Sequence, residues 1–424
     1  MKEILFPYGK EKIGFGFGDE LVAVLEPSIN SYIPEADGGE LVRRAMASPI
    51  GSPRLSELAK GKEKIVIIAS DHTRPVPSGL IIPPMLAEIR EGNPRADITI
   101  LIATGCHRGT TVDELVSKFG EEIVKNEKIV IHDCDERDML VNIGTLPSGG
   151  ECVINRLAAE ADLLVSEGFI EPHFFAGFSG GRKSVLPGVA GRRTVLSNHC
   201  SEFIAHPRAR TGILEGNPIH ADMLRAAKRA KLAYIVNVVL NAEKDVIYAV
   251  AGDPEAAHGK GTDFLFSLCG ADAVDADIVI TTNGGYPLDQ NMYQAVKGMT
   301  AAEATVRRGG VIVMLAESGD GIGGDHFYHQ LADEPDIEKT MALFLSRSRE
   351  ETVPDQWQTQ ILLRILGHAS VIYVSEMPDE VVEKMHMIPA HSLGEAIDKA
   401  KGLVGNGAKI AAIPDGVSVM VRGR

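Results

Sequence analysis

The sequence predicts an α/β protein made of two α/β domains with mostly parallel sheets. Short apolar, β-branched runs recur along the 424-residue chain, and amphipathic helical patterns lie between most of them. This length exceeds what one hydrophobic core usually serves. We expect domains at residues 1–272 and 273–424, because a new strand begins at Ile278. An active site is expected in the cleft between them.

The expected elements follow in chain order. Strands are expected at Ile65–Ala69, Ile98–Ala103, Lys128–Ile131, Leu163–Val165, Tyr234–Leu240, Ile278–Thr281, Val311–Leu315, Val371–Val374 and Ile410–Ile413. Helices are expected at Leu80–Glu91, Val112–Phe119 and Ile219–Leu232. The alternating segment Gly14–Gly18 is expected in a β-hairpin.

Composition and charge exclude several classes of protein. A net charge of −15 argues against nucleic acid as the main partner. The absence of an 18-residue apolar run argues against a membrane span, and the N-terminal residues are too polar for a signal peptide. The five cysteines are scattered and form no C-x-x-C pair, which is typical of a reducing compartment. We therefore expect a cytoplasmic protein.

Three polar loops follow expected strands, namely Ser70–Pro75, Thr104–Arg108 and Glu167–Lys183. Ligands gather at the carboxyl ends of parallel strands, so these loops should share one rim of a sheet. In the first loop Arg74 offers a planar fork for a carboxylate or phosphate, or a stabilising partner for Asp71. In the second, His107 is placed either for proton transfer or for a capping role.

The third loop carries the most informative motif of the chain, Glu-Pro-His-Phe-Phe-Ala-Gly-Phe-Ser-Gly-Gly-Arg-Lys-Ser-Val-Leu-Pro-Gly at 171–188. It combines His173, Lys183 and glycines that allow close approach of a ligand, and His199 follows soon after. Neighbouring phenylalanines would lower the pKa of the lysine and make its amine nucleophilic. This pattern predicts an active site built around a bound cofactor.

Two nucleotide-binding motifs are only partly matched. Lys183-Ser184 could end a P-loop, G-x-x-x-x-G-K-[ST], but Arg182 occupies the glycine position next to the lysine. A P-loop-like nucleotide hydrolase is therefore a remote alternative. Gly319–Gly324 matches G-x-G-x-x-G, yet no second strand with an acidic end follows at the required spacing, so a tight loop is expected there.

A segment of the second expected domain combines Tyr293, Gln294 and Lys297. If a helix begins near Asp289, these side chains form one compact face suited to an anion. A solvated helix surface is the alternative.

Several of these segments together resemble one family, the nickel-dependent lactate racemases. They are SDHTRPVP (70–77), TGCHR (104–108), HFFAGFSGGRKSVLPG (173–188), SNHC (197–200) and GGYPLDQNMYQAVKGMTAAEAT (284–305). The resemblance covers essentially the whole chain. It departs at Cys106, where the family can have phenylalanine, and this difference bears on the wall of the substrate pocket.

The resemblance implies a cofactor and roles for named residues. The cofactor is a nickel-pincer nucleotide, Ni(II) pyridinium-3,5-bisthiocarboxylate mononucleotide, linked to Lys183 as a thioamide and built by separate maturation enzymes. His199 would complete the coordination of nickel, and His107 and His173 would be the paired acid and base. The first domain would hold the cofactor through Asp71, His72, Thr73 and Arg74, and the second would contribute substrate-binding Tyr293, Gln294 and Lys297, helped by Arg74.

The chemistry of 2-hydroxy acids agrees with two histidines. Loss of the α-hydrogen as hydride is easier than loss as a proton beside a carboxylate, provided that a base takes the hydroxyl proton and an electrophile takes the hydride. The planar keto acid can then turn and be reduced on its other face, which calls for a second base. We expect an isomerase that racemises lactate, with malate, a longer 2-hydroxy acid or a sugar acid as alternative substrates. The oligomeric state is left open.

Overall fold

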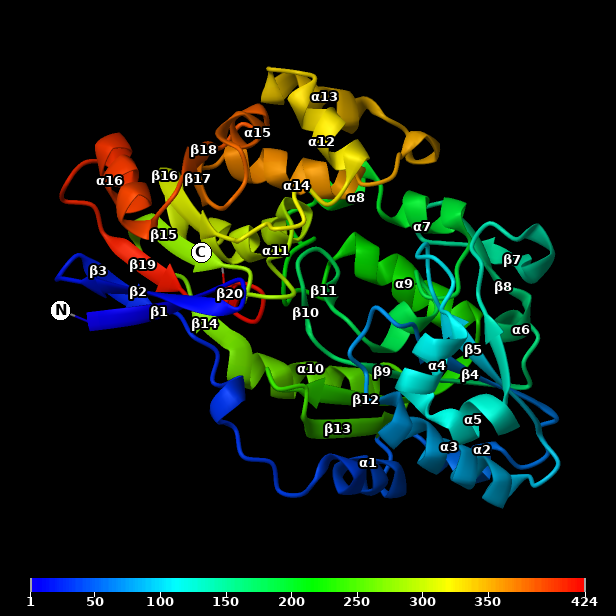
Figure 1. Cartoon of the computed structure of the whole chain (residues 1–424). Helices are drawn as coiled ribbons and strands as arrows, with labels where there is room; N and C mark the ends of the chain where they lie inside the picture. The colour runs from blue at the N-terminus through cyan, green and yellow to red at the C-terminus, as the bar shows by residue number, and fades with distance from the viewer. Residues whose placement is uncertain (1, 423–424) are drawn as a thin grey trace. The chain divides into compact units, whose positions relative to one another are not determined.

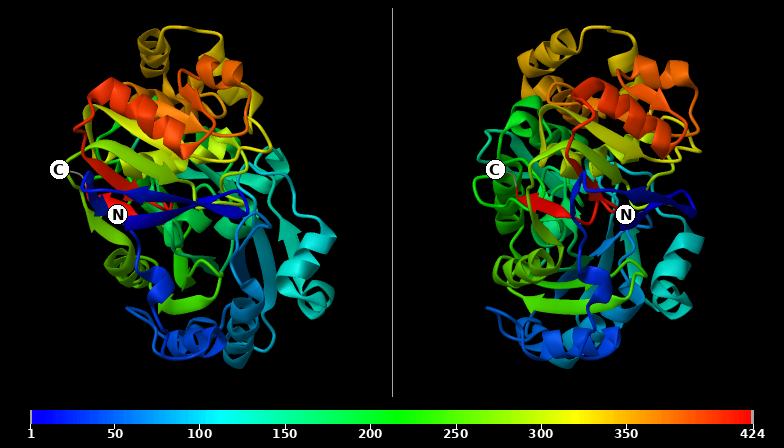
Figure 2. Two further views of the ribbon diagram at one scale, coloured as in Figure 1. Left: turned by 60° about the vertical axis from the view of Figure 1, so that its left-hand side comes forward. Right: turned by 90° about the vertical axis from the view of Figure 1, so that its left-hand side faces the viewer.

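A six-stranded sheet lies at the centre of each of two units in the computed structural model, which describes residues 2–422 (Figures 1 and 2). The middle unit comprises Ile29–His199 and Ile213–Ser267. The terminal unit comprises the residues up to Ser28, Cys200–Gly212 and the residues from Leu268 onward. These units differ from the expected ranges 1–272 and 273–424, because residues 2–28, 200–212 and 268–272 group with the C-terminal part. The mixed α/β class with mostly parallel sheets is confirmed.

The sheet of the middle unit has the order β13-β12-β9-β4-β5-β6. Its strands are β4 (Lys64–Ser70), β5 (Asp97–Ala103), β6 (Lys128–Ile131), β9 (Leu163–Phe169), β12 (Leu232–Leu240) and β13 (Val246–Gly252). Only the edge strand β13 runs antiparallel to its neighbour, whereas the other pairs are parallel. The strands are apolar on both faces because helices and loops cover both sides of the sheet.

Helices enclose this sheet. They are α1 (Gly38–Ala47), α2 (Leu55–Leu58), α3 (Ser78–Gly92), α4 (Val112–Phe119), α5 (Glu121–Asn126), α6 (Arg156–Ala159), α7 (Arg192–Asn198), α9 (Pro218–Arg229) and α10 (Ala256–Cys269). One face packs on α1, α3 and α4 through a core that includes Ile67, Ile100 and Val236. The 3₁₀ turn η3 (Gly181–Ser184) contacts β4, β9 and β12 and is covered by α9. The segment containing Lys183 is thereby fixed on the sheet.

The remaining elements of this unit are short. They are the hairpins β7 (Leu140–Thr145)–β8 (Glu151–Asn155) and β10 (Pro172–His173)–β11 (Gly177–Phe178), with the 3₁₀ turns η1 (Ile29–Ser31) and η2 (Arg137–Met139). The hairpin β10–β11 brings His173 opposite Gly177.

The sheet of the terminal unit is parallel throughout and has the order β18-β17-β16-β15-β19-β3. Its strands are β3 (Leu21–Val24), β15 (Ala276–Thr282), β16 (Val306–Leu315), β17 (Ser370–Val374), β18 (Ile388–Ala390) and β19 (Ile410–Ile413). The first strand of this sheet in sequence, β3, pairs with the last, β19. This pairing explains why the N-terminal residues belong to the C-terminal unit.

Helices and a hairpin complete the terminal unit. The helices are α8 (Ser201–Ala205), α11 (Met292–Glu303), α12 (Asp325–Ala332), α13 (Ile337–Ser346), α14 (Gln356–Leu366), α15 (Asp379–Lys384) and α16 (Leu393–Val404), with the 3₁₀ turn η4 (Arg349–Glu351). The predicted hairpin is β1 (Lys2–Tyr8)–β2 (Glu11–Phe17) (Figure 1). It buries Phe6 and Phe17 in one core with α16. A short parallel pair joins β14 (Gly270–Asp272) to β20 (Met420–Arg422).

In each sheet the strand order reverses at one point, so that the chain adds strands to one side and then to the other. Ligands of open α/β sheets bind at such switch points. In the middle unit the switch lies between β4 and β9, so the loops after Ser70 and Phe169 meet there. In the terminal unit it lies between β15 and β19. There the backbone N–H of Gly416, which follows β19, donates to the carbonyl of Thr282 at the end of β15, at 3.2 Å.

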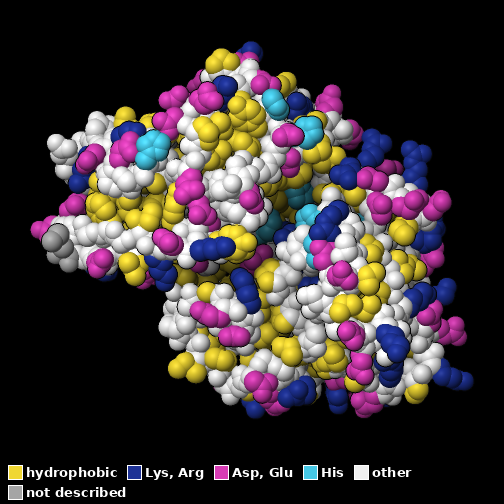
Figure 3. All heavy atoms as spheres, viewed as in Figure 1, with side chains coloured by type: hydrophobic (Ala, Val, Ile, Leu, Met, Phe, Trp, Pro, Cys, Tyr) yellow, Lys and Arg dark blue, Asp and Glu magenta, His cyan; other side chains and the backbone are white. Residues whose placement is uncertain are grey.

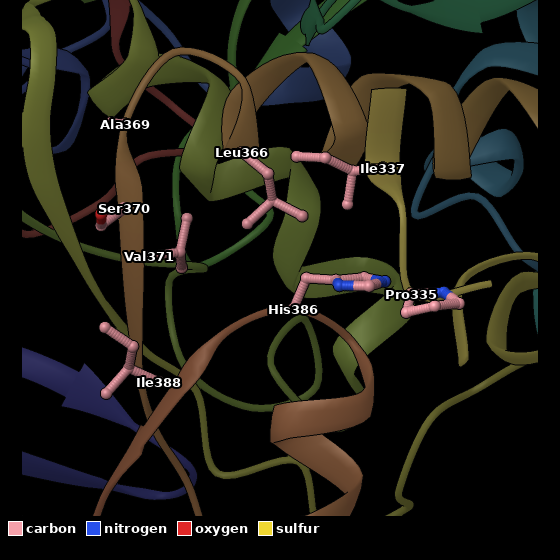
Figure 4. Close-up of a pocket in the computed structure, with 8 residues that line it drawn as sticks. All are labelled: Pro335, Ile337, Leu366, Ala369, Ser370, Val371, His386 and Ile388. Carbon is pink, nitrogen blue, oxygen red and sulfur yellow. The ribbon is translucent and has the colours of Figure 1, made fainter. Parts of the chain in front are cut away.

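A pocket of about 320 Å³ lies elsewhere in the terminal unit (Figure 4). Its lining includes Ser370 and Val371 at the start of β17 and Ile388 at the start of β18. The pocket therefore opens at the amino ends of these strands. Loops at the carboxyl ends, where α/β sites are usual, are at the other edge of the sheet.

Charges of both signs are interspersed on the face shown in Figure 3, and its described side chains form no continuous basic surface. None of the helices within residues 2–422 is long and apolar enough to cross a membrane.

Candidate active site

His107 is paired with a buried carboxylate. Its Nδ1 lies 2.8 Å from Oδ2 of Asp71, which is 1% exposed, whereas the His107 side chain is 45% exposed. Burial opposes ionisation of Asp71, but hydrogen bonds from His107 and Thr73 outweigh it and hold the pKa of this carboxyl below its ordinary value. The carboxylate accepts from Nδ1–H, so the lone pair of the neutral ring lies on Nε2.

The rest of the 71–74 loop surrounds this pair. The Thr73 hydroxyl donates to Oδ1 of Asp71 at 2.7 Å. Nδ1 of His72 lies 3.0 Å from the Thr110 hydroxyl. Arg74 is exposed, and within residues 2–422 Asp71 pairs with His107 rather than with Arg74. The loop of residues 71–74 therefore orients His107 through Asp71 and leaves Arg74 exposed.

A second buried acid, Glu167, binds the chain on both sides of the 71–74 loop. Oε1 of Glu167, near the end of β9, accepts from the backbone N–H of Ser70 at 2.7 Å and from the Ser78 hydroxyl at 3.1 Å. Burial raises the pKa of Glu167, against the nearby charge of Lys118. Lys118 Nζ donates to the carbonyls of Arg74 and Val76 at 3.0 and 3.2 Å. Sequence reasoning missed both residues, although a glutamate inside a buried strand is itself a signal.

His173 has the opposite tautomer to His107. Its Nδ1 accepts from the backbone N–H of Ala176 at 3.2 Å, so the proton of the neutral ring lies on Nε2. Its ring meets the edge of Phe175 with centroids 4.5 Å apart. Phe175 also packs against His199, with centroids 5.1 Å apart. One aromatic side chain thus separates the two predicted histidines.

His199, the predicted nickel ligand, is held by a backbone carbonyl. It is buried, and its Nδ1 lies 2.9 Å from the carbonyl of Val195, one turn earlier in α7. This acceptor fixes the proton on Nδ1 and leaves the lone pair on Nε2, the usual arrangement of a metal-binding imidazole. Burial, followed by the positive charge of Lys183, lowers the pKa of His199 to about 3, which keeps the ring neutral.

Arg182 holds the loop that carries Lys183. Its buried guanidinium donates to the carbonyls of Phe178 and Ala176, both at 2.8 Å, and from Nε to Nδ1 of His220 at 3.0 Å. It also lies 3.2 Å from Nε2 of His258. Burial lowers the pKa of Arg182 to about 9. At the position where a P-loop has a glycine facing phosphate, this chain has Arg182, whose guanidinium binds carbonyls of its own loop and so acts as an internal clamp.

Two glycines of this loop are required by close packing. A Cβ on Gly188 would lie 2.2 Å from the carbonyl oxygen of Ser184, and one on Gly180 (φ +79°) would lie 2.8 Å from that of Phe169. The chain's own backbone occupies this space, so packing alone already requires glycine at both positions.

One hydrogen bond joins the loops that carry the two predicted acid/base residues. The backbone N–H of Gly105, two residues before His107, donates to the carbonyl of Gly188 at 2.9 Å. The middle unit therefore holds His107, His173, Lys183 and His199 on loops that contact one another.

The predicted substrate-binding residues lie on α11 of the terminal unit. This helix begins at Met292, later than expected, and Tyr293, Gln294 and Lys297 are partly exposed on one face. Its first backbone N–H groups are already occupied, since Met292 donates to Gly321 at 3.0 Å and Tyr293 to Ile322 at 2.9 Å. An anion at this face would therefore be bound by side chains, not by the helix terminus.

The Tyr293 hydroxyl is held by two residues that sequence reasoning did not select. It donates to Oδ1 of Asp355 at 3.1 Å and also hydrogen-bonds Trp357. Burial, followed by the charge of Asp355, raises the pKa of Tyr293. Trp357 therefore takes part in orienting a predicted site residue.

Neither nucleotide-binding motif forms its characteristic structure. Lys183 lies in the four-residue turn η3 and not at the start of an α-helix, so no P-loop is formed. Gly319–Gly324 forms the predicted tight loop, whose carbonyls cap α11.

Family models match both halves of the chain, the lactate racemase N-terminal domain at residues 8–212 and the lactate racemase C-terminal domain at 271–421. The proteins named lactate racemase from Thermoanaerobacterium thermosaccharolyticum and Lactiplantibacillus plantarum are 54% and 53% identical over the full length of both chains.

The chain belongs to the lactate racemase family. It is accordingly a racemase, an isomerase. The solved lactate racemase apoprotein from T. thermosaccharolyticum has a TM-score of 0.95 and 54% identity, covering 99% of this chain and 100% of that one. A Thermotoga maritima protein of known structure, 18% identical with a TM-score of 0.62, covers 92% of this chain and 100% of that one, and shares the fold.

Proposed function

We propose that this member of the lactate racemase family interconverts D- and L-lactate, using a nickel-pincer nucleotide tethered to Lys183. The relatives named lactate racemase support the substrate. The observation that supports the mechanism best is the 2.8 Å bond between His107 and buried Asp71, together with the opposite tautomer of His173. One imidazole is set to accept at Nε2 and the other to donate.

The residues of the middle unit suit such a cofactor. His199 is neutral and has its lone pair on Nε2, which is an ordinary donor for nickel. Lys183 lies near enough for its charge to act on that ring, as a tether to the same group requires. When bound, the cofactor would supply the electrophile that accepts hydride from the α-carbon of the substrate.

The protein's own groups handle the proton. His107 Nε2 would accept the proton of the substrate hydroxyl, and Asp71 would stabilise the imidazolium that results. His173 Nε2–H would donate a hydrogen bond to the keto oxygen on the other side. After the keto acid turns, reduction on its other face requires His173 to supply a proton, so the bond from the Ala176 N–H to its Nδ1 would have to open when the ring is protonated.

The substrate carboxylate needs a cationic anchor about which the rest of the molecule can turn. We assign it to Lys297 and Gln294, with help from Arg74 and with Tyr293 lining the pocket. The fixed hydroxyl of Tyr293 supports this assignment, because a side chain held by Asp355 and Trp357 can shape a pocket wall. A site shared by the two units, in the predicted cleft, stays a prediction.

Natively matured protein provides the test. Matured protein is incubated with D-lactate, and L-lactate is followed by a chiral assay; malate and sugar acids are run in parallel. We expect racemisation of lactate, an added mass on Lys183, and loss of both in Lys183→Ala. His107→Ala and His173→Ala should keep the mass and lose roughly 10²–10⁴-fold in rate. Activity without the added mass, or turnover of another 2-hydroxy acid but not lactate, would contradict the proposal.

We also propose a reducing, cytoplasmic location, where maturation enzymes would act on the chain, because no disulfide joins the cysteines within residues 2–422.

A further inference from the structure

Two cysteines lie side by side next to the predicted base His107. Cys106 follows β5 and Cys134 follows β6, and these strands are paired with Ile102 opposite Ile131. The two loops are joined again beyond the strands, where the Thr104 hydroxyl donates to the carbonyl of His132 at 2.6 Å. The thiols of Cys106 and Cys134 share a hydrogen bond.

The two thiols differ in access and in reactivity. Cys106 is partly exposed, whereas Cys134 is buried. The hydrogen bond from Cys134 lowers the pKa of Cys106, with a smaller contribution from the charge of Arg192 and against the effect of burial. The same hydrogen bond, followed by burial, raises the pKa of Cys134. An accessible, more acidic thiol with a protonated partner is the arrangement of an attacking and a resolving cysteine.

We propose that Cys106 and Cys134 form a thiol-modification site that reacts with low-molecular-weight disulfides and closes to an internal disulfide. The thiolate of Cys106 attacks one sulfur of the reagent, breaks its S–S bond and releases one thiolate. Cys134 then gives its proton to that thiolate and attacks the Cys106 sulfur, displacing the second thiolate, which takes from solvent the proton that Cys106 released on ionising. The two cysteines lose two electrons, and the reagent is reduced to two thiols.

The first step prepares the second. The main cause that raises the pKa of Cys134 is its hydrogen bond to Cys106, and a mixed disulfide at Cys106 removes that acceptor charge. The two loops leave neighbouring strands, and the hydrogen bond from Thr104 to His132 holds them together beyond the paired residues. Closure therefore asks for little movement of the sheet.

Closure should affect catalysis through His107. The ring of His107 is held by Asp71, and the backbone of its loop is held to Gly188 through Gly105. A covalent bond from the preceding residue to the β6 loop would shift this ring from its place. This effect on activity rests on the proposed function, whereas the thiol chemistry does not.

A metal site is the rival explanation. Ligand atoms of Asp133, Cys134 and Asp135 lie within 4.8 Å of one another. However, Asp135 already forms a two-pronged ion pair with Arg192, at 2.8 and 2.7 Å. Cys106 is not a member of that group, so the described ligands favour a dithiol over a metal centre.

The test uses the full-length reduced protein and glutathione disulfide. After incubation, remaining thiols are alkylated and the protein is analysed by intact and peptide mass spectrometry. We expect the wild type to lose two hydrogens and give a Cys106–Cys134 cross-linked peptide. Cys134→Ser should stop at one glutathione on Cys106. Cys106→Ser should react with glutathione disulfide at least roughly tenfold more slowly than wild type and form no cross-link.

Buried Cys269 provides the matched control, because burial raises its pKa to about 12 and Cys269→Ala should leave the cross-link unchanged. Equal reaction of Cys106→Ser and wild type would overturn the proposal. So would protection of both thiols by stoichiometric zinc, which would favour the metal site.

Matured enzyme gives the functional readout. Its lactate racemisation should fall with cross-linking and return with dithiothreitol, and Cys134→Ser should recover with the removal of one glutathione. A cross-link in a chain that never racemises lactate would refute the proposed substrate and leave the thiol site intact. Full activity in cross-linked enzyme would refute the coupling to His107.

Discussion

Different partners orient the rings of the two predicted acid/base histidines. A buried carboxylate orients His107, and the backbone N–H of Ala176 orients His173. The carboxylate stabilises a positive ring, whereas a backbone donor at Nδ1 can be accepted only by a neutral one. We therefore infer that Asp71 makes His107 the preferred proton acceptor before substrate turns over.

Replacing Asp71 tests this inference. Asp71→Asn keeps the size of the side chain but removes the charge and permits the wrong tautomer of His107. We expect kcat for lactate to fall roughly 10²–10⁴-fold with cofactor mass on Lys183 retained. Asp113→Asn, at an exposed position on α4, is the matched control and should leave kcat unchanged. An Asp71→Asn enzyme within a few-fold of wild type would show that the carboxylate does not orient the base.

At the scale of elements, the loop around η3 depends on one clamp. Arg182 ties the carbonyls of Ala176 and Phe178 together, and the backbone N–H of Gly181 donates to Oδ1 of Asn237 at 2.8 Å. Lys183 therefore projects from a turn that is fixed on both sides.

Arg182→Lys should loosen this turn, because an ammonium cannot reproduce the planar set of donors. We expect the free energy of unfolding to fall by about 2–4 kcal/mol and the fraction of chains carrying cofactor mass on Lys183 to drop. Denaturant titration and intact mass measure the two effects. Exposed Arg193→Lys makes the same chemical change without the clamp and should match wild type. Unchanged cofactor loading and unchanged stability in Arg182→Lys would show that Arg182 does not fix the loop that carries Lys183.

Helix α11 is tested through its lysine. Since its first N–H groups are occupied by loop carbonyls, substrate anchoring should depend on the side chain of Lys297. Lys297→Ala should raise KM for lactate about 10–100-fold, the loss of one charge-assisted hydrogen bond, and change kcat less. Lys399→Ala on the exposed face of α16 is the control. A KM unaffected in Lys297→Ala would place the carboxylate elsewhere.

Sequence patterns predicted the bounds of strands and helices far better than they predicted contacts between side chains. The strands β5, β6 and β19 were expected almost residue by residue because their apolar runs are continuous. The helix expected at Ile219–Leu232 ends at Arg229, since the last of those residues already belongs to β12. Family resemblance pointed to His107 and His173, but Asp71 as the partner of His107 and Glu167 beneath the loop depend on pairings that only folding creates.

At the scale of the whole molecule, buried neutral histidines predict sensitivity to acid. Burial, with the adjacent charge of Arg182, lowers the pKa of His220 to about 4 and that of His258 to about 3, from 6.5. Between about pH 6.5 and 4 the unfolded chain binds more protons than the folded one, so the free energy of unfolding falls as pH is lowered. The two sites together could remove several kcal/mol, at roughly 1.4 kcal/mol per pKa unit.

Denaturant midpoints from pH 7 to 4 measure this loss. The double variant His220→Gln, His258→Gln should begin less stable but show a shallower decline. His391→Gln, at an exposed position, should keep the wild-type slope. Parallel slopes in wild type and double variant would assign the acid sensitivity to other groups.

The pairing of β3 with β19 has a consequence for synthesis of the chain. A ribosome releases residues 21–24 long before residues 410–413, the neighbours that they need. The polypeptide also passes between the units after residues 28, 199, 212 and 267. The terminal unit thus cannot be completed until residues 410–413 have been synthesised, and a fragment that contains β19 without β3 would present the unprotected edge of β19 to other copies of itself.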